Sequence, residues 1–197
     1  MPTTRKYISY CPVRQELGMK AVLQRCLSAS VTVDANVVSS IGKGVLVLAA
    51  IGPNDTQKTV ESMAGKVLKM RLWPDESDGQ WKKNVQDIQG EVLCVSQFTL
   101  YASTRKGNKP DFHGAAKPDL AKDLYAHFVS TIQKSYQSAK VKDGVFQAMM
   151  EVALVNDGPV TLQMDSEDPK KSSGVSTPTS SSLTSDGPPA GPPVGPL

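Results

Sequence analysis

The sequence predicts one α/β domain, built on a mixed β-sheet that carries two helices on one side. Segments rich in β-branched and apolar residues share the chain with two segments of helical periodicity. Their order is several strands, helix, strand, helix and strands, which is typical of a mixed sheet with its helices on one face. The patterned part, residues 19–164, has the normal size of a single hydrophobic core.

The first strands are expected at the start of this core. Residues 20–34 are rich in β-branched and apolar residues, and their side chains alternate in character between Ser30 and Val33. Residues 37–52 contain the turn signal Gly42-Lys43-Gly44, followed by an apolar run typical of a buried strand. Residues 91–102 predict a further strand.

The two helices are predicted from apolar stripes at helical spacing. Asp55 or Thr56 is expected to begin the first helix, and Pro118 fits the first turn of the second. The first stripe consists of Val60, Met63, Ala64, Val67 and Leu68. The second stripe consists of Leu120, Leu124, Phe128 and Ile132.

The last part of the core is expected to hold two strands joined by a turn. Perfect alternation of apolar residues from Phe146 to Leu154 predicts a long strand before Asn156. Residues 156–159, Asn-Asp-Gly-Pro, are all turn formers, and residues 160–164 predict a short final strand.

The two ends of the chain are expected to lie outside the core. Residues 1–18 form a weakly patterned extension. Residues 165–197 are rich in Ser, Pro and Gly, contain no aromatic residue and hold seven of the 14 prolines. Such a composition buries too little apolar surface to offset the entropy of ordering, so we expect a disordered tail.

Composition narrows the class of protein. The net charge of +3 is compatible with nucleic-acid binding but not diagnostic of it, and the cluster of Arg105, Lys106 and Lys109 fits either a solvated loop or a phosphate contact. No apolar run reaches membrane-spanning length and no secretory signal is recognisable, so we expect a cytoplasmic protein. The three cysteines form no C-x-x-C pair, which argues against a disulfide framework or a zinc site. Cys26 and Cys94 are expected to be small buried hydrophobes.

No side-chain catalyst is evident. His127 is expected to be packed or on the surface, whereas His113 lies in a long polar loop where it could touch a ligand, although no acid at a recognisable spacing orients it. None of the familiar hydrolase or phosphate-binding motifs occurs. No metal and no cofactor are predicted.

Two polar features stand out. Ser96, Gln97 and Thr99 follow a buried strand, which fits either an ordinary polar strand end or a ligand site. Residues 156–160 fit a simple turn. From the residues alone, the prediction is an α/β domain with a polar strand end and a proline-containing turn.

The core nevertheless resembles the D-aminoacyl-tRNA deacylases, dimeric esterases that remove D-amino acids from tRNA. The resemblance rests on Ser96-Gln97-Phe98-Thr99-Leu100, on Asn156, Gly158, Pro159 and Thr161 about sixty residues later, and on flanking residues 19–34 and 106–113. Both motifs in this order are highly specific. The resemblance implies barrel-like β-layers with two helices on one side, a homodimer with active sites at the subunit interface, and aminoacyl-tRNA as the partner. It implies no metal and no other cofactor.

The resemblance also implies roles for particular residues. Gly158 and Pro159 would be joined by a cis peptide bond and would reach into the partner subunit's active site, where Gly158 holds the α-ammonium group and Pro159 excludes an L side chain. Glycyl-tRNA would then be cleaved too. The backbone N–H groups of Phe98 and Thr99 would hold the ester carbonyl, while the 2′-hydroxyl of the terminal adenosine assists water.

Four further residues would support this site. Arg25 would brace the Gly-Pro loop with its planar guanidinium, and Asn156 begins the motif that contains the loop. Ala121 and Met150 would line the adenosine pocket.

Two other hypotheses compete with this one. One is a non-catalytic nucleic-acid-binding or replication-associated protein on the same scaffold, with the tail recruiting partners. The other is a conventional serine or threonine esterase with Thr99 as nucleophile, which predicts that Thr99→Ala abolishes activity.

Overall fold

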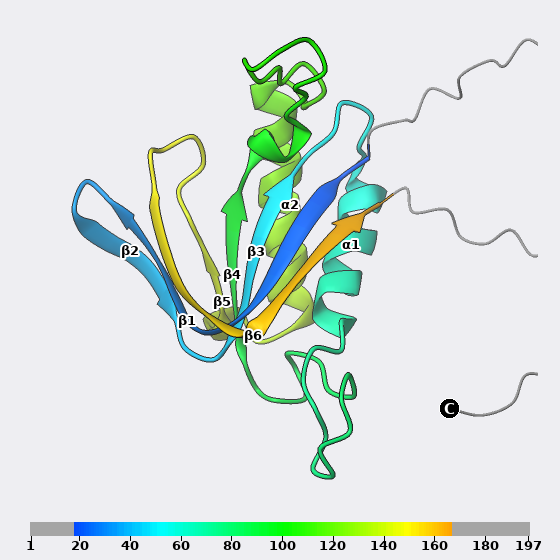
Figure 1. Ribbon diagram of the computed structural model, residues 1–197, viewed down its shortest axis with the longest axis vertical. Coiled ribbons are helices and arrows are strands. Elements are labelled where there is room, and N and C mark those ends of the chain that lie inside the picture. Colours follow the sequence, from blue (N-terminus) through cyan, green and yellow to red (C-terminus); the bar gives the residue numbers. More distant parts are fainter. Residues whose placement is uncertain (1–17, 167–197) are drawn as a thin grey trace, which may run out of the picture.

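The computed structural model describes residues 18–166 (Figure 1). The predicted extension at 1–18 and the predicted tail at 165–197 therefore lie outside the described residues, except where they adjoin the core. A single six-stranded sheet curls toward a barrel, in the order β2-β1-β3-β4-β5 with β6 on β1. The two helices, α1 and α2, cover one side of it. The expected α/β class with helices on one side is confirmed.

β1 (Lys20–Val33) organises the sheet because it is paired along both edges. Its first half pairs antiparallel with β3 (Gly44–Ala50) and its second half with β2 (Asn36–Ile41). β6 (Glu151–Asp165) pairs with nearly the whole length of the other edge of β1.

The parallel part of the sheet carries the helices. β3 pairs in parallel with β4 (Glu91–Ser96), and β4 with the short β5 (Val141–Asp143). Parallel neighbours need crossover connections, and α1 and α2 provide them. At the start of β3, a Cβ on Gly44 would come within 1.9 Å of the Glu91 carbonyl oxygen, so the close approach of these two strands requires glycine.

Both helices begin where the sequence places them. α1 (Gln57–Lys69) is capped by Thr56, which accepts from the backbone N–H of Thr59, and α2 (Pro118–Ser135) has Pro118 in its first turn. The predicted stripe of α1 is entirely buried. In α2 the prediction was wrong for Leu120, which is 39% exposed, because the first three residues of the helix are all exposed; burial begins at Leu124.

The C-terminal part of the core differs from expectation. The strand expected from Phe146 begins only at Glu151, because residues 145–148 form a turn in which Ala148 N–H donates to the Val145 carbonyl (3.2 Å). Residues 156–159 do not separate two strands either. β6 runs through them, and the extra chain length is absorbed by shifts of register against β1.

The strand expected to extend to residue 102 also ends early. β4 stops at Ser96, and the 3₁₀ helix η1 (Phe98–Tyr101) follows. A second short 3₁₀ helix, η2 (Ser138–Lys140), precedes β5.

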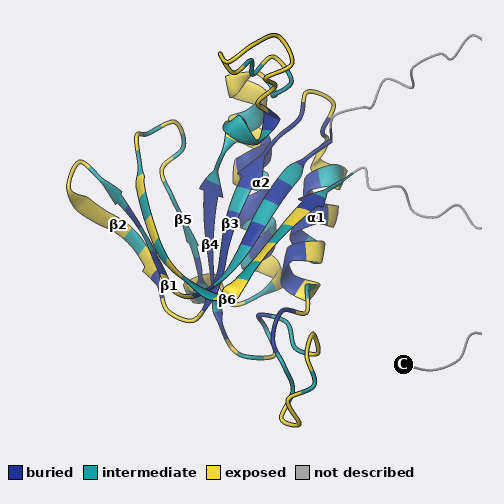
Figure 2. Ribbon diagram, viewed as in Figure 1, coloured by how far each residue is buried: buried dark blue, intermediate teal, exposed yellow. Residues whose placement is uncertain are grey.

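The main core cluster joins residues of the sheet with the buried stripes of α1 and α2. A smaller cluster includes Leu46, Leu93 and Val95, which alternate along β3 and β4 with members of the main cluster and therefore face the other side of the sheet. Figure 2 shows buried residues along β3, β4 and both helices. Cys26 and Cys94 are buried without a disulfide, as expected. Within residues 18–166, neither helix combines the length and apolar character needed to cross a bilayer.

Candidate active site

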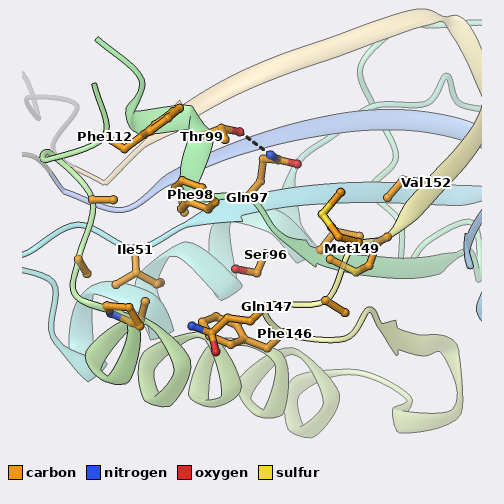
Figure 3. A pocket seen from close by; sticks show the side chains of 18 residues that line it. Ile51, Ser96, Gln97, Phe98, Thr99, Phe112, Phe146, Gln147, Met149 and Val152 are labelled. Atoms are coloured by element: carbon orange, nitrogen blue, oxygen red, sulfur yellow. Dashed lines mark hydrogen bonds between the residues drawn. The ribbon is translucent and has the colours of Figure 1, made fainter. Parts of the chain in front are cut away.

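A cavity of about 860 Å³ lies beyond the carboxyl ends of β3 and β4 (Figure 3). A volume of this order is typical of pockets that bind small molecules. Its walls come from the ends of β3 and β4, from η1, from the loop before α2 and from the start of α2, with residues 146–150 and Val152 closing the remaining side. Six residues named from the sequence meet here, namely Ser96, Gln97, Phe98, Thr99, Ala121 and Met150.

The turn from β4 into η1 places Ser96, Gln97 and Thr99 at the cavity wall. Ser96 is the last residue of β4, and the Gln97 N–H still donates to the Ala49 carbonyl (2.8 Å), as if the ladder continued by one residue. The Gln97 side-chain amide then donates to the Thr99 hydroxyl oxygen. This hydrogen bond links the two side chains at the cavity wall.

The next two backbone N–H groups are free. Those of Phe98 and Thr99 donate to no acceptor among the described residues, because they open η1, whose first internal bond comes later. Phe98 is exposed and its ring meets Phe112 edge to face, with 5.2 Å between ring centroids. Two adjacent, unpaired N–H groups beside a cavity are suited to bind a carbonyl oxygen that gains negative charge.

The cavity has no ionisable wall. Among the described residues that line it there is no His, Asp, Glu, Lys, Arg, Cys or Tyr. Ser96 and Thr99 are its hydroxyl groups, and no general base adjoins either of them there. A conventional nucleophile needs such a base within hydrogen-bond reach, so this wall is suited to binding and polarising a substrate rather than to attacking it.

The opposite wall is apolar and rigidly supported. Ala121 on α2, Met150 and Phe146 contribute to it. Behind Phe146, the ring of Tyr125 lies 5.9 Å away between centroids, and the Tyr125 hydroxyl donates to the Asp143 carboxylate (2.5 Å). Burial raises the pKa of Asp143 above its ordinary value.

The four other predicted residues form a second group, at the bend of β6. Gly158 and Pro159 are exposed, and the peptide bond between them is cis. Asn156 supports the bend, because its side-chain oxygen accepts from the Val160 N–H (3.0 Å). Arg25 lies underneath with a side chain only 12% exposed. Its Nε is 3.1 Å from both the carbonyl oxygen and a carboxylate oxygen of Asp157.

The two groups do not meet within one chain. Ser96 is level with Ala49, which pairs with Ala21 of β1, whereas Gly158 lies beside Arg25. Arg25 follows Ala21 by four steps along the strand, or roughly 13 Å at about 3.3 Å per residue. Figure 1 shows the bend of β6 at one end of the sheet and the end of β4 at the other.

The histidines lie outside the cavity lining. His127 bonds through Nε2 to Glu61 (2.8 Å), which agrees with a packed or surface position. His113 differs from expectation in one respect, because Asp111 does orient it through bonds to both its backbone N–H and its Nδ1. The local hydrogen bonding of this loop explains the pair, since an Asp side chain readily binds the N–H two residues on.

Several cavity residues were not predicted, among them Phe112, Phe146, Gln147 and Met149. The alternation of residues 146–150 was attributed to a strand, although these residues alternate around a turn that closes the cavity. A non-glycine residue at positive φ, here Gln147 at 63°, carries no signal in the sequence.

A match to a known protein family shows which family this chain belongs to. The model of the D-Tyr-tRNA(Tyr) deacylase family matches residues 22–165, which include both motifs and the whole cavity. The chain belongs to this deacylase family.

Similar proteins agree with that membership. A D-aminoacyl-tRNA deacylase of Yarrowia lipolytica is 54% identical over 154 residues, which cover 77% of this deacylase-family chain and all of the relative. Human D-aminoacyl-tRNA deacylase 1 is 48% identical over 151 residues, covering 77% of this chain and 72% of the relative.

Solved structures show the same fold. The structure of "c-Myc DNA Unwinding Element Binding Protein" is 48% identical, with a TM-score of 0.71 over 74% of this chain and 97% of its own. A probable eukaryotic D-amino acid tRNA deacylase, 17% identical with a TM-score of 0.63 over 75% of this chain and 98% of its own, shares the fold.

Proposed function

We propose that this protein hydrolyses the ester bond that joins a D-amino acid to the terminal adenosine of tRNA. The observation that carries the proposal is the pair of unpaired N–H groups of Phe98 and Thr99 beside a cavity with no ionisable wall. Membership of the deacylase family supplies the substrate class. We also propose a cytoplasmic location for this activity.

The two N–H groups would stabilise the transition state. The ester carbonyl oxygen accepts from both, water adds to the carbonyl carbon, and negative charge develops on that oxygen. The bond to the 3′-oxygen then breaks, and the 3′-oxygen takes the proton that water loses. The adjacent 2′-hydroxyl of the substrate assists water, which replaces the general base that the cavity wall lacks. In other enzymes, removal of one such donor lowers kcat by a factor of about 10²–10³.

The apolar wall would hold the adenosine. Ala121 leaves space for a base because its side chain is a single methyl group, and Met150 and Phe146 offer apolar surface to the faces of the base. This places the reacting ester toward Phe98 and Thr99.

A second copy of the chain would complete the site. Gly158 and Pro159 are exposed and do not line the cavity of their own chain. Leu27 and Val155, at the same bend of the sheet, are large apolar residues that are 52% and 53% exposed. A symmetric dimer would cover them and would insert each Gly-Pro loop into the partner's cavity.

The inserted loop would select chirality by exclusion. Gly158 would offer its carbonyl to the α-ammonium group, and Pro159 would occupy the space of an L side chain. Arg25 and Asn156 would brace the loop through the contacts described above. Glycine has no side chain to exclude, so glycyl-tRNA is also expected to be a substrate.

The test is deacylation of D-tyrosyl-, glycyl- and L-tyrosyl-tRNA by the purified protein, with a metal chelator present. The proposal predicts rapid loss of the D and glycyl esters while the L ester persists. Equal loss of the D and L esters would contradict the chiral filter, and stability of all three would contradict the activity.

The similarity to "c-Myc DNA Unwinding Element Binding Protein" favours one other function, the binding of DNA on the same scaffold. Arg105, Lys106 and Lys109 are exposed in the loop before α2, where they could contact phosphates. Retention of DNA by a protein that hydrolyses none of the three esters would favour this function.

A further inference from the structure

Gln147 occupies a backbone conformation that usually belongs to glycine. The Val145–Ala148 turn is closed by its 3.2 Å hydrogen bond, and its third residue, Gln147, has φ of 63° while Phe146 does not have a positive φ. This pattern fits a type II turn, whose third position favours glycine. A side chain kept at such a position beside a cavity is a candidate for function.

The side chain is free to bind a ligand. Gln147 lines the cavity, is exposed, and has no hydrogen bond to another described residue. Its amide offers two donors and an acceptor. Gln97, the other amide of the cavity, is already bonded to Thr99.

The turn that carries Gln147 is held in place from several directions. The Gly144 N–H donates to the Cys94 carbonyl (2.9 Å), and the Val145 N–H lies 3.3 Å from the Met150 sulfur. The ring of Tyr125 packs against Phe146. The position of Gln147 relative to the apolar wall is therefore well defined.

Gln147 lies on the side of the cavity that would receive the base. Figure 3 shows it beside Phe146 and next to helix α2, across the view from Thr99. Apolar groups of Phe146, Met150 and Ala121 would pack on a planar ring, but none of these side chains can recognise its edge. The Gln147 side-chain amide can recognise that edge through hydrogen bonds.

We propose that the Gln147 side chain hydrogen-bonds to the edge of the terminal adenine and so determines specificity for that base. Adenine presents a ring-nitrogen acceptor next to its 6-amino donor, and a glutamine amide matches both. This inference rests on the proposed function, because the deacylase substrate supplies the adenosine.

The experiment compares wild type and Gln147→Gly on three forms of D-tyrosyl-tRNA. The last nucleotide is adenosine, purine riboside, which lacks the 6-amino group, or 7-deazaadenosine, which lacks N7. Wild type should lose about tenfold or more in kcat/KM on purine riboside, since a bidentate contact is worth about that factor. Gln147→Gly should lose a similar factor on adenosine, mainly through KM, and should no longer distinguish adenosine from purine riboside. The 7-deaza substrate shows which ring nitrogen is the acceptor: a loss assigns N7, and no loss assigns N1.

Two controls separate recognition from folding. Gln147→Gly should keep or raise the Tm because glycine suits the positive φ. Val145→Ala, on the same turn but outside the cavity lining, should leave the discrimination unchanged.

The outcomes distinguish the two proposals. Equal kcat/KM of wild type on adenosine and purine riboside, or equal discrimination by wild type and Gln147→Gly, would overturn the role of Gln147 alone. Failure of wild type to hydrolyse the unmodified substrate would overturn the proposed function and this inference with it.

Discussion

At Gly158 a positive φ and close neighbours together constrain the chain to glycine. Its φ is 122°, and an added Cβ would come within 2.8 Å of the Val160 side chain and 3.0 Å of the Arg25 guanidinium. Gly158→Ala is therefore expected to lower the free energy of unfolding by about 1–3 kcal/mol and to reduce activity on the D ester. Urea unfolding and deacylation measure the two effects.

Gly65 offers a matched control for that substitution. It lies within α1, and an added Cβ would meet nothing within 4 Å. Gly65→Ala should raise the free energy of unfolding by up to about 1 kcal/mol, because alanine is the better helix former. If both substitutions changed stability alike, the local constraint at Gly158 would be refuted.

Thr99 separates the backbone mechanism from a nucleophilic one. Thr99→Ala removes the hydroxyl that Gln97 binds but keeps the backbone N–H, so most of the deacylase activity should survive, within about tenfold of wild type. A conventional threonine esterase would lose activity by about 10⁴ or more. Single-turnover rates on D-tyrosyl-tRNA decide between them.

At the level of elements, Asp55 ties the start of β1 to the segment between β3 and α1. Its carboxylate accepts from the Met19 N–H (2.9 Å) and from the Gly52 N–H (2.6 Å). Burial raises the pKa of Asp55 above its ordinary value of 3.8, although the two N–H groups act in the opposite direction. The folded protein thus binds this proton more tightly than the unfolded chain.

This raised pKa predicts a particular pH dependence. The contribution of the bound proton to stability is fully present below about pH 3.8 and is lost as the pH rises through the raised pKa of the folded state. Asp55→Asn does not titrate. The free energy of unfolding of wild type minus that of Asp55→Asn should therefore fall as the pH rises through this window in urea titrations. A difference that stays constant or rises would contradict the assignment.

Helices and strands could be predicted from the sequence where their apolar residues follow a single periodicity. The α1 stripe from Val60 to Leu68 and the long strand β1 have clear patterns because each buries one face. The turn at residues 145–148 was missed because residues that line a cavity alternate as a strand does. The bend at Asn156–Pro159 was predicted as a simple turn between two strands because its turn formers also suit an irregular strand, and only pairing with β1 decides between the two.

The site shows the same division. The polar strand end at Ser96–Thr99 is visible in the sequence. Its free N–H groups arise because the 3₁₀ helix η1 begins there, and no residue type in the sequence indicates that helix. The contact of Arg25 with Asp157 spans 132 residues, a separation at which spacing carries no information. The family resemblance identified both groups of residues, the one around Ser96–Thr99 and the one around Arg25 and Gly158. The structure adds that the two groups lie at opposite ends of the sheet.

At the scale of the whole molecule, the proposed activity requires two copies of the chain. One chain holds a cavity without a chiral filter and, elsewhere, an exposed Gly158-Pro159 loop without a cavity. A symmetric dimer would join them twice. Loss of either group should then be rescued by a partner that carries the other.

The most direct test of this central claim is a mixed dimer assayed on D-tyrosyl-tRNA. One subunit carries Ala121→Trp, which fills its cavity, and the other carries Gly158→Val, which disables its loop; two affinity tags isolate the mixed species. Each variant alone should be inactive. The mixed dimer should recover about half of the wild-type rate, because one of its two symmetry-related sites combines an intact cavity with an intact loop. A mixed dimer as inactive as its parents, or a fully active monomer, would contradict the account.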